Sequence, residues 1–106
     1  MQVNIATQFG TSLVSRPAGR EAFAALDANI LRQLPKDERI EIDFTELDVL
    51  TPSWAEEFFP KLRAEYGDRV VLLPSTNPSV QLTLETIGQS PGDALDQQHV
   101  ARFFPR

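Results

Sequence analysis

The 106-residue sequence contains no cysteine. That absence excludes disulfides, thiolate metal sites and thiol catalysis within the sequence, and it suits a reducing compartment. Long apolar runs are also missing, since none approaches the roughly 20 residues that span a bilayer. The N-terminus lacks the basic region and apolar stretch of a signal peptide. We therefore expect a cytoplasmic protein that is not embedded in a membrane.

Positive charge is scarce as well. Ten Lys and Arg residues stand against 15 Asp and Glu, giving a net charge of −5. A surface of this composition repels phosphate groups, so nucleic acid and anionic membranes are not expected partners. The single histidine, His99, lies in the poorly patterned C-terminal part, and motifs for nucleotide binding, nucleophilic serine or zinc are missing. The sequence thus predicts no enzyme activity, no metal site and no cofactor.

Strand and helix patterns alternate along the chain. Strands are predicted at Gln2 to Ala6, Ile40 to Phe44 and Arg69 to Leu73, and a short one at Leu13 and Val14 would form a hairpin with the first. The strand predicted at Arg69 to Leu73 is continuously apolar after its first residue. Such a run is typical of a strand covered on both faces, so we expect it at the centre of the sheet. In Ile40 to Phe44 the apolar residues alternate with acidic ones, which predicts one solvated face or a specific hydrogen-bond donor for Asp43.

Three helices are predicted from their start signals. Ser15, Thr51 and Asn77 are suitable N-caps, and each is followed within two residues by a proline. Pro60 lies inside the second helix, where we expect a kink rather than an end. Together these elements predict an α/β domain over residues 1–88, with a mixed, mostly parallel sheet of about four strands and three helices. Residues 89–106 would form a C-terminal extension, partly ordered or with a short helix.

Candidate functional residues gather around the strand Ile40 to Phe44 and the helix after it. Asp43, Glu46 and Asp48 form an acidic cluster that is either a solvated loop or a partner-facing or cation-binding patch. Ser53 lies at the start of the second helix, where free N–H groups and the helix dipole favour a phosphate.

Two arginines stand out at the start of the first predicted helix. Arg16 and Arg20 oppose the dipole there, so they either contact an anion or a partner, or form salt bridges to Glu21 or to the region of Asp43.

The run IDFTELDVLTPSWAEEF, residues 42–58, resembles the strand–turn–helix of STAS-like domains, small bacterial relatives of anti-sigma-factor antagonists. Asp43-Phe44, Leu47, Val49-Leu50 and Ser53 occupy matching places. The run LVSRPAGR, residues 13–20, is similar to the start of a STAS-like subgroup of unknown function. The resemblance extends over about residues 13–87.

The resemblance implies a non-enzymatic, regulatory protein-interaction module that binds its partner around the start of the second helix. In the antagonists the partner is a histidine-kinase-like ATPase, an anti-sigma factor, which phosphorylates a serine; Ser53 takes that place here. Two places depart from the pattern, since Thr51-Pro52 replaces the acidic residue before the serine and Trp54 replaces the small residue after it. Glu56 and Glu57 would also lie close to a phosphate at Ser53 and disfavour it. The expected contact residues are Asp43, Glu46, Asp48, Thr51, Ser53, Trp54 and Glu57. An exposed Trp54 would anchor such an interface, whereas a buried one would have no such role.

Two other classes of function remain open. A small-molecule or nucleotide sensor would use the same strand ends, because α/β sheets bind ligands outside their carboxyl edges. An enzyme with carboxylate chemistry at Asp43 or Asp48 is the weakest hypothesis, because the sequence offers no nucleophile–base pair.

Overall fold

The structure, a computed structural model, describes residues 1–89. Residues 90–106, which are all but the first residue of the predicted C-terminal extension and include His99, lie outside the described residues. None of the helices in the described part has the length and apolar character needed to cross a membrane. The elements follow in the order β1 (Gln2–Asn4), α1 (Ile5–Phe9), β2 (Ser12–Leu13), α2 (Arg16–Asn29), β3 (Ile40–Asp43), β4 (Val49–Leu50), α3 (Pro52–Tyr66), β5 (Val70–Leu72) and α4 (Pro78–Thr86), with 3-10 turns at Leu31–Gln33 and Gly67–Arg69.

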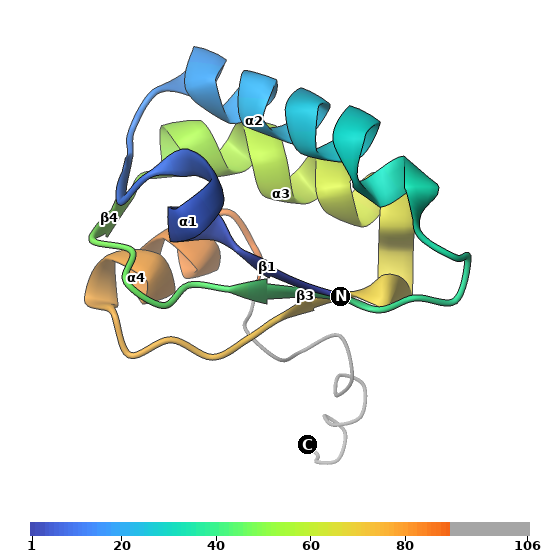
Figure 1. The fold of residues 1–106 in the computed structure, drawn as a ribbon. Coiled ribbons are helices and arrows are strands. Elements are labelled where there is room, and N and C mark those ends of the chain that lie inside the picture. Colours follow the sequence, from blue (N-terminus) through green and yellow to red (C-terminus); the bar gives the residue numbers. More distant parts are fainter. Residues whose placement is uncertain (90–106) are drawn as a thin grey trace.

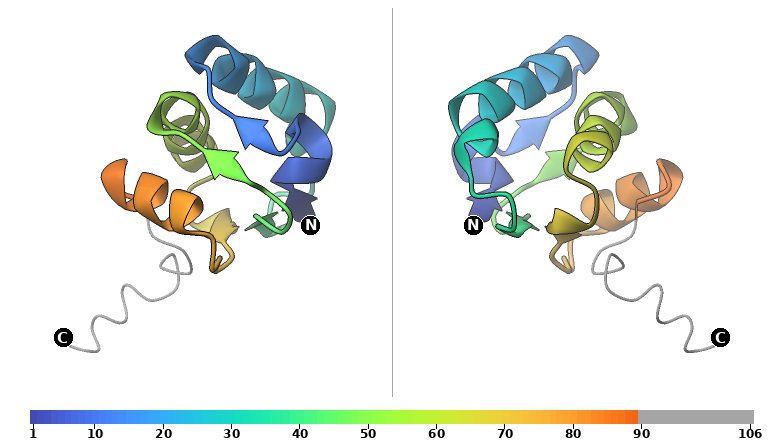
Figure 2. Two further views of the ribbon diagram at one scale, coloured as in Figure 1. Left: turned by 90° about the vertical axis from the view of Figure 1, so that its left-hand side faces the viewer. Right: turned by 90° about the vertical axis from the view of Figure 1, so that its right-hand side faces the viewer.

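The main sheet has three parallel strands in the order β1-β3-β5, and β2 and β4 pair in a second, two-stranded parallel sheet. Ile42 of β3 lies opposite Val3 of β1 and Leu72 of β5. The spatial order follows the chain order, so both crossovers pass over the same face of the sheet. Helices α2 and α3 lie side by side on that face (Figure 1), and α4 packs against α3 and β4 (Figure 2).

Local chemistry accounts for the starts of the longer helices. The side chains of Ser15, Thr51 and Asn77 accept hydrogen bonds from the backbone at the starts of α2, α3 and α4, as predicted. Helix α3 continues through Pro60 to Tyr66. Its apolar stripe supplies much of the core, because Phe58, Phe59 and Leu62 on one side of the helix are all buried.

The alternation in β3 has the predicted meaning. Ile40 and Ile42 point into the core and are fully buried, whereas Glu41 and Asp43 are partly exposed. At β1 and β3 the sheet therefore buries one face under α2 and α3 and turns a polar face away from them.

Helices α2 and α3 approach closely at Gly19. A Cβ atom added at Gly19 would lie only 2.3 Å from the carbonyl oxygen of Trp54. Because the backbone of one helix touches that of the other, a residue without a side chain is required at this point.

The N-terminal hairpin predicted from the sequence is wrong. Ile5–Phe9 forms the short helix α1, whose start is capped by the Asn4 side chain, which accepts a hydrogen bond of 2.8 Å from the Thr7 N–H. Phe9 then packs its ring on Trp54 and Phe58. This turn of helix carries the chain away from β1, and β2 pairs in parallel with β4 instead.

The predicted sheet order also needs correction. β3 is the central strand and β5 lies at the edge, although Val70, Val71 and Leu72 are all buried. A continuous apolar run reports burial of both faces, which an edge strand can have as well. The chain is a small α/β domain as predicted, but its described part, residues 1–89, has five strands in two sheets and four α-helices.

Candidate functional site

The carboxyl ends of β3 and β5 meet in a polar surface built from two loops. We call Asp43, the loop Thr45–Asp48 and the loop Ser75–Asn77 the strand-end surface. The two loops line a cavity of about 470 Å³. The Asn77 side chain joins them, since its amide nitrogen donates to the carbonyl oxygens of Leu47 at 2.6 Å and Asp48 at 3.2 Å. Of the acidic residues predicted from the sequence, Asp43 therefore ends β3, and Glu46 and Asp48 lie in the loop that Asn77 holds in place.

Asp43 is the most densely bonded carboxylate of this surface. The Thr45 hydroxyl donates to it at 2.7 Å and the Thr45 N–H at 3.1 Å. The side-chain amides of Gln2 and Asn4 donate at 3.1 and 3.3 Å. These bonds, led by the Thr45 hydroxyl, hold the pKa of Asp43 below its ordinary value. The specific donor predicted from the sequence is thus present, and Asp43 supports the loop.

We predict that this network weakens in acid. Because the folded-state pKa of Asp43 is depressed, its contribution to stability is present above the unfolded value of about 4 and is lost as the pH falls through the folded value. The urea midpoint of the wild-type protein should fall as the pH drops below about 4. Asp43→Asn should lower the midpoint at neutral pH and make it less sensitive to acid. Parallel pH profiles for the two proteins would contradict this role.

Glu46 and Asp48 differ from Asp43 because their carboxylates are exposed, and neither forms an ion pair within residues 1–89. The sequence has no Lys or Arg between Arg39 and Lys61. Glu46 also has a φ of 70°, a left-handed conformation that is uncommon for a residue other than glycine. The loop therefore presents negative charge that nothing in its own sequence neutralises.

The start of α3 adjoins the second sheet. The Thr51 hydroxyl accepts from the Trp54 N–H at 3.5 Å and lies 3.2 Å from the carbonyl oxygens of Leu13 and Val14, to which it can donate. Thr51 is thus engaged inside the fold, which leaves little of its side chain for a partner. Ser53 is half-buried, and within the described part of the chain its hydroxyl forms no hydrogen bond.

Trp54 is buried, so the predicted role as an interface anchor is wrong. Only 1% of the residue is exposed. Its ring stacks on Phe58 at 4.8 Å and contacts Phe9 at 5.8 Å. The reason is the helical spacing, because Trp54 and Phe58 are one turn apart on the stripe that faces the core. The contact surface is left with Ser53 and the loop.

Arg16 and Arg20 form salt bridges across the two helices. Arg16 lies 3.1 Å from a carboxylate oxygen of Glu56 and 3.0 Å from one of Glu57, and Arg20 lies 3.3 Å from Glu57. Lys61 also reaches Glu57 at 3.3 Å. The hydrogen bond from Arg16 is the main cause that holds the pKa of Glu57 below its ordinary value.

These pairs bear on two predictions. The arginines do pair with carboxylates, but with those of α3 rather than with Glu21 or Asp43. Glu57, expected to contact a partner, is already surrounded by three cations of its own chain. The reason is that α2 and α3 lie side by side, which brings residues about 40 positions apart into contact.

A buried acid at the far ends of α2 and α3 was not predicted from the sequence. Asp27 is 7% exposed and accepts hydrogen bonds from the Tyr66 hydroxyl and from Arg32, the latter at 3.0 Å. The available signal was the position of Asp27 beside Leu26 on the apolar stripe of α2. The cluster ties the two helices together.

Tyr66 should titrate late as a result. Burial, followed by the hydrogen bond to Asp27, raises its pKa to about 12. A raised folded-state pKa means that the contribution to stability is complete below about pH 10 and is lost as the pH rises towards 12. Tyr66 is the only tyrosine, so the absorbance of tyrosinate reports on it directly. We expect little tyrosinate at pH 10.5 in the folded protein, and titration at the value of a free tyrosine would contradict the buried cluster.

Metal binding finds no support in residues 1–89, where no group of three or more carboxylate or imidazole side chains is arranged to hold an ion.

Comparison with known proteins adds one match to this geometry. The model of a family described as "STAS-like domain of unknown function (DUF4325)" matches residues 25–81. The matched part runs from the second half of α2 into α4 and contains the strand-end surface and the start of α3. No curated protein and no solved structure matches the chain.

Proposed function

Since the chain belongs to the family of STAS-like domains of unknown function, we propose that it is a non-enzymatic protein-interaction module. Its contact surface is the strand-end surface together with Ser53 on the first turn of α3. The observation that carries this proposal is the contrast in charge pairing. Glu56 and Glu57 are neutralised by cations of α2 and α3, whereas Glu46 and Asp48 have no ion pair within the described residues.

A contact surface fits the topology better than a ligand crevice at the strand ends does. Open α/β sheets bind ligands at the point where the strand order reverses and the crossovers change face. Here the order β1-β3-β5 runs in one direction, so the main sheet has no such point. The polar loops instead lie at the carboxyl ends of β3 and β5, where another protein has access to them. We therefore favour a protein partner over the small-molecule sensor at this place.

The chemistry of the surface indicates a basic partner. Uncompensated carboxylates speed and orient the encounter with a positively charged patch, and they reject acidic proteins. By resemblance to the anti-sigma-factor antagonists, we propose a histidine-kinase-like ATPase as this partner.

Ser53 is the proposed switch of that interaction. Its hydroxyl forms no hydrogen bond within residues 1–89. The objection from the nearby glutamates weakens, because Arg16, Arg20 and Lys61 offset the charges of Glu56 and Glu57. A phosphate at Ser53 would add about −1.5 to −2 charges beside this network and would compete for Arg16.

Site-specific photo-crosslinking in the source cells tests the proposal. A crosslinking residue placed at position 46 or 48 should capture the same partner, and one placed at position 68 should not. Asp68 precedes β5 and so lies at the opposite edge of the sheet, which makes it a matched acidic control. Incubating the captured partner with the protein and ATP, followed by mass spectrometry, then locates any phosphate. Equal capture from positions 46 and 68 would contradict the proposed surface, and no phosphate at Ser53 would reject the switch alone.

A further inference from the structure

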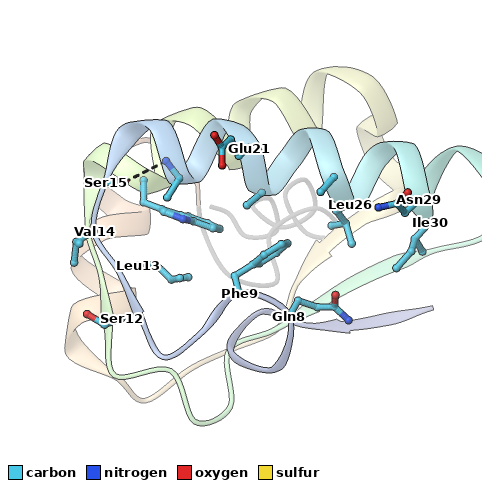
Figure 3. A pocket seen from close by; sticks show the side chains of 14 residues that line it. Gln8, Phe9, Ser12, Leu13, Val14, Ser15, Glu21, Leu26, Asn29 and Ile30 are labelled. Carbon is cyan, nitrogen blue, oxygen red and sulfur yellow. Dashed lines mark hydrogen bonds between the residues drawn. The ribbon is translucent and has the colours of Figure 1, made fainter.

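A groove of about 580 Å³ lies away from the strand-end surface, between α2 on one side and α1 with β2 on the other. Its volume is in the range of roughly 300–1,000 Å³ that is usual for small-molecule sites. The walls are mainly apolar. Figure 3 shows Phe9 reaching from α1 towards α2, Leu13 on β2, and Leu26 and Ile30 at one end of the groove.

The groove exists because α2 turns small side chains towards it. Ala18, Ala22 and Ala25 lie on one face of the helix and line the groove, where larger residues would fill the space between α2 and α1. These alanines explain the volume. They do not by themselves indicate what occupies it.

The indicator of a ligand is Trp54, which also lines the groove. Only 1% of the surface of Trp54 is exposed. Its backbone N–H has an acceptor in Thr51, but its indole N–H has none among the described residues. Buried polar groups are hydrogen-bonded in about nine cases of ten. Trp54 thus carries a buried donor without an acceptor and lines an apolar groove, which indicates that the acceptor comes from outside this part of the chain.

We propose that the groove binds a small, flat, mainly apolar and uncharged molecule, with a hydrogen-bond acceptor of that molecule taking the indole N–H of Trp54. The apolar walls select the body of the ligand, and the single buried donor orients it. Glu21 lies on α2 at the groove and forms no ion pair within residues 1–89 (Figure 3). Its negative charge disfavours an anionic ligand. This site is separate from the proposed contact surface, so either can fail without the other.

Quinoline is a suitable probe, because it is flat, uncharged at neutral pH and carries one ring-nitrogen acceptor. Trp54 is the only tryptophan, so its indole ¹H–¹⁵N signal reports on the groove without assignment of the whole spectrum. We expect this signal in the full chain to move downfield in a saturable way. A probe of this size should bind with a dissociation constant on the order of 1 mM. Quinoline-6-carboxylate should bind several-fold more weakly, and Glu21→Gln should reduce that difference.

Two variants of α2 form the matched test. Ala25→Leu fills the groove from an exposed helical position and should weaken quinoline binding roughly tenfold or more, whereas Ala24→Leu, exposed but outside the groove, should leave it unchanged. An indole signal that does not move with several millimolar probe would overturn the proposal. So would equal binding by the two variants. A signal that moves with an added peptide of residues 90–106, but not with quinoline, would assign the groove to the chain's own C-terminal segment and reject a small-molecule ligand.

Discussion

Replacing Gly19 by alanine will destabilise the protein, although alanine is the better helix former. The intrinsic preference of α2 for alanine is worth about 1 kcal/mol in favour of the variant. Against it stands the added Cβ atom, 2.3 Å from the Trp54 carbonyl oxygen. That oxygen belongs to the backbone of α3, so it cannot turn away, and the two helices must separate. Overpacking typically costs about 1–3 kcal/mol and occasionally more. Because the contact is with backbone, we expect about 3 kcal/mol here, and a net loss of about 2 kcal/mol after the gain in helix propensity.

Urea unfolding of Gly19→Ala measures this loss directly. The matched control is Ala24→Gly at an exposed position of the same helix, which should lose about 1 kcal/mol through helix propensity alone. One variant replaces glycine by alanine and the other replaces alanine by glycine, yet both should lower the free energy of unfolding. If Gly19→Ala instead raised the free energy of unfolding, α2 and α3 would not be in backbone contact, and the alignment of Arg16 with Glu57 would be in doubt.

Trp54→Ala will have the largest effect of any substitution considered, and the effect will be on stability. Truncating a buried tryptophan typically costs about 3–5 kcal/mol. That is a large share of the 5–15 kcal/mol that stabilises a typical domain. Trp54→Phe keeps an aromatic ring in the stack with Phe9 and Phe58, so it should cost much less.

Fluorescence separates this core role from an interface role. In the wild-type protein the emission of Trp54 should be blue-shifted and resistant to iodide quenching, and urea should abolish both properties. Trp54→Phe should still bind the crosslinked partner with wild-type affinity at temperatures where it is folded. Strong iodide quenching in the native state, or loss of partner binding by a folded Trp54→Phe protein, would return Trp54 to the contact surface.

The sequence predicted best those features that local chemistry decides. The caps Ser15, Thr51 and Asn77 act within three residues of themselves, and the alternation in β3 reflects which face each side chain occupies. Strand pairing depends instead on partners far along the chain. Leu13 pairs with Leu50 rather than with β1, and nothing local in either segment specifies that choice. The short helix α1 had a single signal in Asn4, since five residues are too few to show helical periodicity.

In the candidate site, too, features set by local sequence were predictable and those set by packing were not. The position of Asp43, Glu46 and Asp48 around a strand end follows from the chain order, and so it was predictable. The engagement of Arg16 and Arg20 was not, because their partners lie on a neighbouring helix whose rotation only packing determines. Trp54 shows the limit most clearly. Its residue type suggests an interface anchor, while its spacing from Phe58 places it in the core.

The charge of the strand-end loop tests the proposed function most directly. Once crosslinking has identified the partner, its dissociation constant should be measured at several salt concentrations for the wild-type protein, Glu46→Lys and Asp68→Lys. Each substitution reverses the charge of one exposed acidic residue. At position 46, where the backbone is left-handed, Glu46→Lys also replaces one non-glycine residue by another. The proposal predicts that Glu46→Lys weakens binding about tenfold or more and flattens its salt dependence, while Asp68→Lys changes affinity less than about twofold. Equal losses for the two variants, or a wild-type affinity for Glu46→Lys, would contradict it.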